Sequence, residues 1–165
     1  MTKPLPELIA EEIVSRLQGI TVEDGYPFGV PSVDRVQRGA KDWTPRNLAI
    51  AVEQSDENEN LQQSHPGNPP AAAYDVVYRL HAFVRPSDRT VPETAQTTEN
   101  AMVASIKQAI TAEGHRWHTF GEVAIDARWG STSRFVSAEG DHAGVTMTLI
   151  VTYRASETDP YESRA

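Results

Sequence analysis

The sequence contains no cysteine, and this absence removes several kinds of chemistry at once. Disulfides, thiolate zinc sites and cysteine nucleophiles are all excluded. The N-terminal segment 1–7 has no apolar core of the kind a secretory signal requires, so we expect a protein assembled in the cytoplasm. No apolar run approaches the roughly 18 residues of a membrane-spanning helix, so we expect no membrane partner.

Sequence motifs of the common enzyme classes are also missing. There is no Gly-x-Ser-x-Gly, no phosphate-binding Gly-Lys-Ser/Thr and no dinucleotide glycine fingerprint. His115 and His118 would point to opposite faces of a strand, with no third ligand nearby. Segment 56–67 begins like a calcium loop, but it has Leu61 where that loop needs glycine and Gly67 where it needs glutamate. We therefore expect no catalytic residue, no metal and no cofactor.

Basic residues are in the minority, with 15 Lys and Arg against 23 Asp and Glu and a net charge of −8. Affinity for duplex DNA comes mostly from neutralising phosphates, so this balance disfavours general nucleic-acid binding. The chain has 165 residues, of which 39% are hydrophobic. That length and composition fit one soluble domain with a real core, and we predict a single domain over 1–165.

The clearest structural signal is a strand near the C-terminus. Apolar side chains alternate there with threonines, which is the period of a half-buried strand. The apolar set is Val145, Met147, Leu149, Val151 and Tyr153. A second long strand is predicted over 73–85 on the same pattern, and shorter strands over 30–38, 47–53 and 116–129, with a turn region at 130–143.

Two helices are predicted on helical spacing of apolar residues. The first covers 5–18, with Gly19 as its stop, and the second runs from Pro92 to Glu113. The order of elements indicates an α+β fold, in which a mainly antiparallel sheet of four to five strands carries two helices on one face.

Segment 54–72 is polar and proline-rich and is nearly free of large apolar side chains. It cannot bury enough surface to offset the entropy cost of ordering it, so we expect a polar loop that projects from the domain. The strands over 47–53 and 73–85 would then form a long β-hairpin with this loop at its tip. A loop of this length inside a domain is often functional.

The layout of the chain resembles the tail terminator proteins of long-tailed bacteriophages. The similarity is carried by Leu8, Ile9, Ile13 and Leu17 and by segments 74–85, 101–110 and 145–161. Within the last segment, Val-Thr-Tyr-Arg over 151–154 and Asp-Pro-Tyr over 159–161 carry the most weight. The resemblance rests on the order of elements rather than on a sharp motif, and segment 54–72 is longer than the family pattern.

This resemblance implies a virion structural protein at the neck of the tail. Such a protein forms a ring of about six subunits that caps the tail tube, ends tail growth and offers a surface to head-completion proteins. DNA would pass through the lumen without specific binding, and an acidic wall suits that passage. The implied partners are further copies of the chain, the tail tube protein and the head-completion or connector protein.

We predict protein contacts on a loop tryptophan, on the hairpin and its loop, and on the C-terminal segment. The residues are Trp43, Asp56, Glu57, Glu59, His65, Tyr74, Arg154, Asp159 and Tyr161. The alternative for Trp43 is packing on its own core, and the alternative for Arg154 and Tyr161 is a frayed terminus. Two other functions stay open: a head-to-tail adaptor or connector, and a small acidic enzyme or ligand-binding domain.

Overall fold

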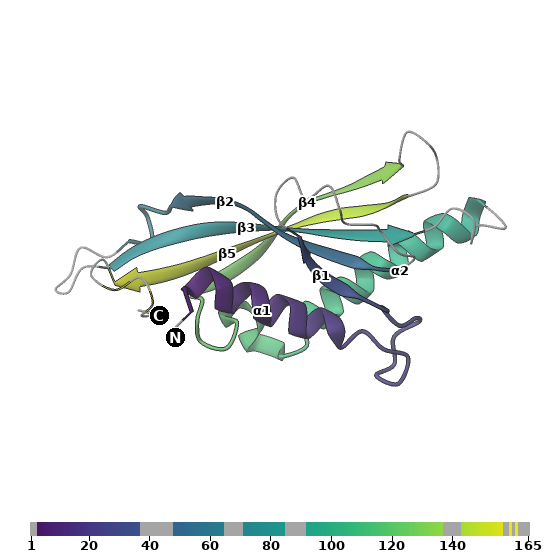
Figure 1. Cartoon of the computed structure of the whole chain (residues 1–165), viewed down its shortest axis with the longest axis horizontal. Helices are drawn as coiled ribbons and strands as arrows, with labels where there is room; N and C mark the ends of the chain where they lie inside the picture. The colour runs from purple at the N-terminus through teal and green to yellow at the C-terminus, as the bar shows by residue number, and fades with distance from the viewer. Residues whose placement is uncertain are drawn as a thin grey trace.

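The fold is taken from a computed structural model of the chain, which describes residues 3–36, 48–64, 71–84, 92–136 and 143–156 together with Asp159 and Tyr161. The described residues form an α+β domain in which one five-stranded sheet carries the helices on one side (Figure 1). The predicted fold class is confirmed.

The strands stand in the order β1-β2-β3-β5-β4. Their bounds are Val33–Val36 for β1, Ile50–Glu59 for β2, Ala71–Val84 for β3, Asp126–Val136 for β4 and Ala143–Ser156 for β5. β1 pairs with β2 in parallel, and the other three pairings are antiparallel. The two longest strands, β3 and β5, lie side by side in register from Ala71 opposite Ser156 to Val84 opposite Ala143.

Both predicted long strands are present because their alternation matches a sheet with one covered face. Val145, Met147, Leu149 and Val151 are buried, as are Val76, Tyr78, Leu80 and Ala82 on β3. The intervening side chains of β3, from Asp75 to Phe83, are only partly buried and face away from the helices. One face therefore holds the core and the other is a polar surface.

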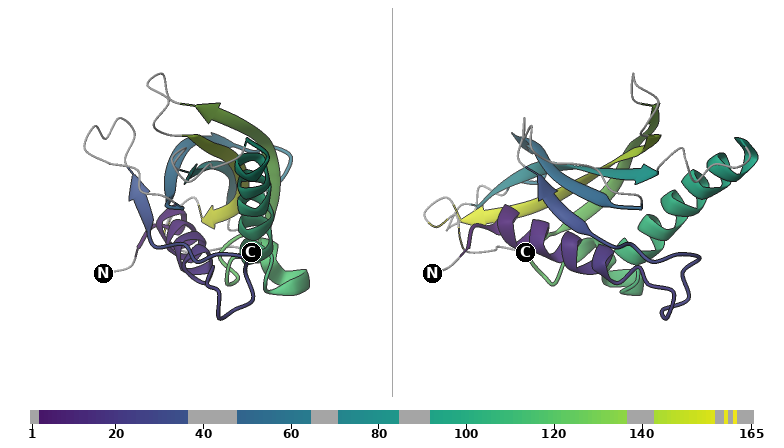
Figure 2. Two further views of the ribbon diagram at one scale, coloured as in Figure 1. Left: turned by 90° about the vertical axis from the view of Figure 1, so that its right-hand side faces the viewer. Right: turned by 45° about the vertical axis from the view of Figure 1, so that its right-hand side comes forward.

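The sheet is strongly curved, and the helices lie on its concave side (Figure 2). Helix α1 spans Leu5–Gln18 and buries Leu5, Ile9, Ile13 and Leu17, as its spacing predicts. Helix α2 spans Pro92–Ile110 and buries Met102, Ile106 and Ile110. A short 3-10 helix, η2, covers Gly114–Thr119 where the sequence pattern predicts the end of a helix and the start of a strand.

Arg16 fastens the two helices together at the end of α2. Its Nη1 donates to the carbonyl of Ile110 at 2.7 Å and to that of Trp117 at 2.9 Å. Its guanidinium also pairs with Glu12 at 2.9 Å and with Glu113 at 2.8 Å. These bonds satisfy carbonyl groups at the end of a helix that would otherwise have no donor.

Several predicted boundaries are wrong. Helix α2 ends at Ile110 rather than at Glu113, and the strand predicted over 116–129 begins only at Asp126, because Gly114–Thr119 forms η2. β2 continues to Glu59 and β3 begins at Ala71, so the predicted loop 54–72 is a strand over 54–59 and again over 71–72. β4 runs through the predicted turn region 130–143 as far as Val136. Residues 54–59 and 130–134 are polar or small, and they lack the apolar alternation that marks a buried strand because these segments lie at open edges and are largely solvated.

Candidate protein-protein interface

One end of the sheet extends past the start of α1 (Figure 1). We call this end the arm and define it as 54–59 of β2, 71–77 of β3 and 150–156 of β5. The Tyr78 hydroxyl, which donates to the carbonyl of Pro6 at 2.7 Å, marks where α1 begins to cover the sheet. The arm is therefore three-stranded, whereas the sequence pattern predicts a two-stranded hairpin.

The outer edge of the arm is acidic and exposed. β1 pairs with β2 only as far as Glu53, and within the described residues no strand pairs with β2 on that side beyond Glu53. Asp56, Glu57 and Glu59 lie along this segment and are exposed. The register shifts between Gln54 and Glu57, which is a β-bulge, and bulges and charges are common protections of an open edge.

An aromatic pair stiffens the concave face of the arm. The rings of Tyr74 and Tyr153 are stacked with their centroids 5.6 Å apart, and Tyr153 is only 5% exposed. Burial raises the pKa of the Tyr153 hydroxyl, and the nearby carboxylate of Glu57 raises this pKa further through its charge and a hydrogen bond. The core of the domain thus continues into the arm through Val76 and Tyr153.

The turn after β2 folds back on the arm. The Asn60 amide donates to the carbonyl of Ala73 at 2.8 Å, and the Ser64 hydroxyl donates to the carbonyl of Asn60 at 3.0 Å. Arg154 donates to the carbonyl of Gln63, with its Nη2 at 2.8 Å. Arg154 therefore holds the turn in place within its own subunit, a role the sequence did not indicate.

Leu61 is the first residue of this turn and is 76% exposed, the most exposed large hydrophobic residue among those described. Its neighbours Asn60 and Gln62 are polar. An exposed aliphatic side chain on a turn fixed by backbone and side-chain hydrogen bonds is suited to anchor a protein contact, because little entropy is lost when it docks.

Asp75 on β3 links β5, β4 and the turn after β2 on the polar face. Its carboxylate accepts from the Thr152 hydroxyl at 2.5 Å, from Arg128 at 2.8 Å and from the Asn60 side-chain amide at 3.1 Å. Burial raises the pKa of this carboxyl, but the hydrogen bonds from Thr152, Arg128 and Asn60, with the charge of Arg128, outweigh burial and lower the pKa overall. The carboxylate thus stays ionised and rigidly placed.

The predicted contact residues are distributed unevenly over the structure. Glu57, Glu59 and Tyr74 come together on one face of the arm, since Glu57 pairs with Val76 and Glu59 with Tyr74 in the β2–β3 ladder. Asp159 accepts a hydrogen bond from the Tyr161 amide at 2.9 Å, and both residues are exposed. Trp43 and His65 lie outside the described residues. Leu61 lies in the predicted 54–72 segment but was not singled out, and Asp75 and Tyr153 were not among the predicted contact residues.

A second polar row crosses the open face of the sheet beside the arm. His81 Nε2 lies 2.9 Å from Glu53 Oε2, and His81 Nδ1 lies 2.9 Å from Thr146 Oγ1. A carboxylate, an imidazole and a hydroxyl in this order can activate a nucleophile in a closed site. Here each side chain comes from a different strand of one open sheet face, so we interpret the row as a cross-strand link.

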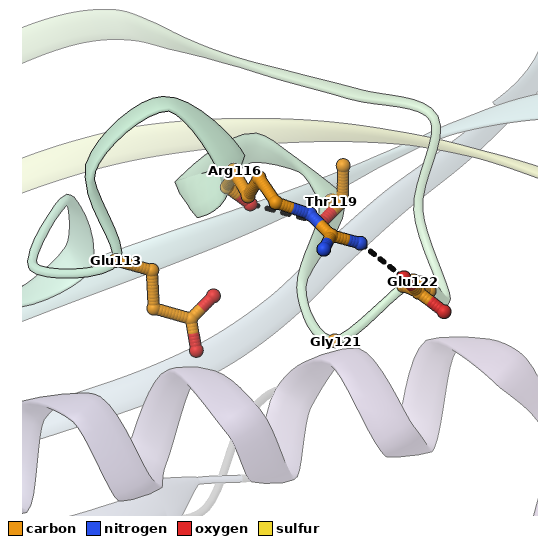
Figure 3. A pocket seen from close by; sticks show the side chains of 5 residues that line it. All are labelled: Glu113, Arg116, Thr119, Gly121 and Glu122. Carbon is orange, nitrogen blue, oxygen red and sulfur yellow. Dashed lines mark hydrogen bonds and ion pairs between the residues drawn. The ribbon is translucent and has the colours of Figure 1, made fainter.

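A shallow pocket of about 410 Å³ lies beside η2 and is lined by Glu113, Arg116, Thr119, Gly121 and Glu122 (Figure 3). The Arg116 guanidinium points toward Glu122 and pairs with it, while Glu113 pairs with Arg16. The charges that line the pocket are thus already matched. Three consecutive residues after η2, Phe120, Gly121 and Glu122, have positive φ, which shapes the rim of the pocket.

No group of three or more metal-ligating side chains occurs among the described residues. In the same part of the chain, no helix is both long and apolar enough to cross a membrane. The chain matches no protein-family model and no curated protein sequence. The geometry of the arm is therefore the main guide to function.

Proposed function

We propose that this protein is a structural component that works by binding other protein layers and further copies of itself. Within that class, we propose a tail terminator of a long-tailed bacteriophage, which forms a ring on the tail tube, ends tube growth and offers a surface for head joining. The resemblance in element order supports the particular assignment. The arm supports the class.

The observation that carries the proposal is the three-stranded arm. It extends past the start of α1, is stiffened by the Tyr74–Tyr153 stack and the hydrogen bonds of Asp75, and exposes Leu61 on the turn that follows β2. A stiff arm with an acidic edge, next to a turn that exposes Leu61, suits docking to another protein rather than catalysis. The net charge of −8 suits a ring through which DNA passes, because the wall would repel the phosphates.

The experiment combines the purified protein with tail tubes that lack their terminator. We expect a ring at one tube end in negative-stain images and tubes that no longer lengthen. A protein that stays monomeric and never associates with tail tubes would contradict the proposal.

Leu61→Ser tests the role of the arm within this function. Leu61 is 76% exposed, so we expect an unchanged fold, but joining of tails to heads should fall at least about tenfold because the anchor is lost. Val22→Ser is the matched control, since Val22 is 62% exposed but lies in the turn region after α1. If the two variants join tails to heads equally well, Leu61 has no role in joining.

A further inference from the structure

Besides the outer side of the short strand β1, two edges of the sheet are open within the described part of the chain. One is the outer side of β2 over 54–59, which lies beyond the end of β1. The other is the outer side of β4, because β4 pairs only with β5. Most side chains of both segments are exposed, and an open edge carries backbone donors and acceptors that can bind a further strand.

The two edges differ in charge. Segment 54–59 of β2 contains Asp56, Glu57 and Glu59 and no basic residue, whereas β4 from 128 onward contains Arg128 and Arg134 and no acidic residue. Arg128 and Arg134 pair with Asp75 and Glu99 of their own subunit but remain about half exposed. A guanidinium has five donors, so each arginine can bind a second carboxylate from outside.

Like edges are therefore poor partners for each other. Pairing 54–59 of one copy with 54–59 of another would bring six carboxylates together, which like-charge repulsion opposes. Pairing 54–59 with β4 brings carboxylates to arginines. The charge pattern thus selects contacts between unlike edges and opposes contacts between like edges.

The strand directions are also compatible with this contact. Three successive antiparallel pairings separate β2 from β4, from β2 to β3, β3 to β5 and β5 to β4, so β2 and β4 run in opposite directions. If a second copy continues the sheet in the same orientation, its β4 meets β2 of the first copy antiparallel. Antiparallel pairing is the more stable arrangement per residue.

Each open edge also contains an irregularity that limits how much of it can pair. The register shifts between Gln54 and Glu57 on β2 and between Trp129 and Thr132 on β4. Bulges of this kind bend and twist a strand. The joint is therefore short and curved rather than a flat sheet that could extend without end.

We propose that copies of this chain join head to tail through β4 of one copy and segment 54–59 of β2 in the next, paired antiparallel. The inference rests on the proposed ring and specifies its subunit joint. A contact between two different surfaces that repeats with a constant rotation closes into a ring, whereas a symmetric contact would stop at a dimer.

The natural absence of cysteine allows a direct test by cross-linking. Asn58→Cys is combined in turn with Ser131→Cys, Thr132→Cys and Ser133→Cys, all at exposed positions. Under mild oxidation of the full chain, we expect at least one double variant to give a ladder of covalent oligomers that ends at the ring size. Each single variant is the control and should give no oligomer larger than a covalent dimer.

The outcomes separate this inference from the proposed function. If light scattering gives the mass of a ring-sized oligomer while none of the three cysteine pairs gives a ladder, the proposed joint is overturned but the proposed ring is not. A strictly monomeric protein with no ladder would overturn both. Efficient covalent dimers from Asn58→Cys alone would show that like edges meet, which would also overturn the joint.

A charge variant tests the electrostatic part of the joint. Glu59→Lys should weaken self-association about tenfold at low salt, and added salt should reduce the difference, because exposed charges are screened. Glu23→Lys changes the net charge equally at an exposed position in the turn after α1 and should associate like the wild type. Equal association of the two variants would contradict the pairing of unlike charges.

Discussion

Two polar residues, Arg16 and Asp75, each bind several partners and connect elements that are distant in sequence. Arg16 serves two carbonyl groups and two carboxylates, and its guanidinium lies 4.6 Å from the centre of the Phe120 ring. Asp75 has a similar role at the arm, where its carboxylate accepts three hydrogen bonds from different segments. Both residues join elements that are distant in sequence, so their loss should affect the whole domain.

We expect Arg16→Met to lower the free energy of unfolding by about 2 to 3 kcal/mol, because two carbonyl groups lose their donor while the carboxylates can still reach water. The measurement is urea denaturation followed by circular dichroism. Arg116→Met is the control, because the Arg116–Glu122 pair is 68% and 72% exposed and should contribute less than about 1 kcal/mol. Equal losses in the two variants would contradict the role assigned to Arg16.

The lowered pKa of Asp75 predicts a dependence of stability on acid. A carboxyl whose pKa is lower in the folded state stabilises the protein above its unfolded pKa of about 3.9, and this contribution disappears as the pH falls through the folded pKa. We expect Asp75→Asn to be less stable than the wild type at neutral pH. The difference should shrink as the pH approaches about 3. A difference that stays constant between pH 7 and pH 3 would contradict this account.

Among the elements, β3 and β5 form the centre on which the other parts are arranged. They pair along 14 residues each, and their buried face receives α2, while α1 packs mainly against β1 and β2. Gly144 is a point of close approach in this pair, because a Cβ added there would lie 1.9 Å from the carbonyl oxygen of Ala82. The absence of a side chain also leaves room beside it for Phe83 and Phe135, whose rings meet edge to face at 5.4 Å.

We therefore expect Gly144→Ala to destabilise the domain by about 3 kcal/mol or more, since the backbone of β3 or β5 must move to admit a methyl group. Thermal unfolding measures the loss. Gly130→Ala is the matched control in the neighbouring strand, where the added Cβ would lie 3.2 Å from the Thr148 side chain and no closer than 3.6 Å to a backbone atom of that residue. If Gly144→Ala unfolds at the same temperature as Gly130→Ala, the close approach is not a constraint on the pair.

At the scale of the whole molecule, the helices cover one face of the sheet. Among the described residues, the other face, the outer side of β4 and the outer side of 54–59 in β2 are left uncovered. The turn after β2 and the end of β4 carry the exposed aliphatic residues Leu61 and Val136. The charges on the open edges oppose each other in sign, which favours an ordered assembly over a random one. In the proposed ring, neighbouring subunits pair through β4 and segment 54–59 of β2. Leu61 then stays accessible to an adjoining protein.

The sequence by itself determined the elements that have a local signature. Helix α1 and strands β3 and β5 follow from apolar spacing, because a side chain repeats on one face of a helix or strand whatever lies beside it. The α+β class follows from their order. These predictions agree with the structure almost to the residue for α1, which was predicted over 5–18 and spans Leu5–Gln18.

Only the tertiary structure decided where the edge strands run and what the polar residues do. Segment 54–59 becomes a strand because Glu57 to Glu59 pair with β3, and β4 extends to Val136 because β5 is there to pair with it. The parallel pairing of β1 with β2 and the partners of Arg16, Asp75 and Arg154 also join distant segments. Hydrogen bonds between strands form wherever a partner backbone is present, and local sequence carries little record of that partner.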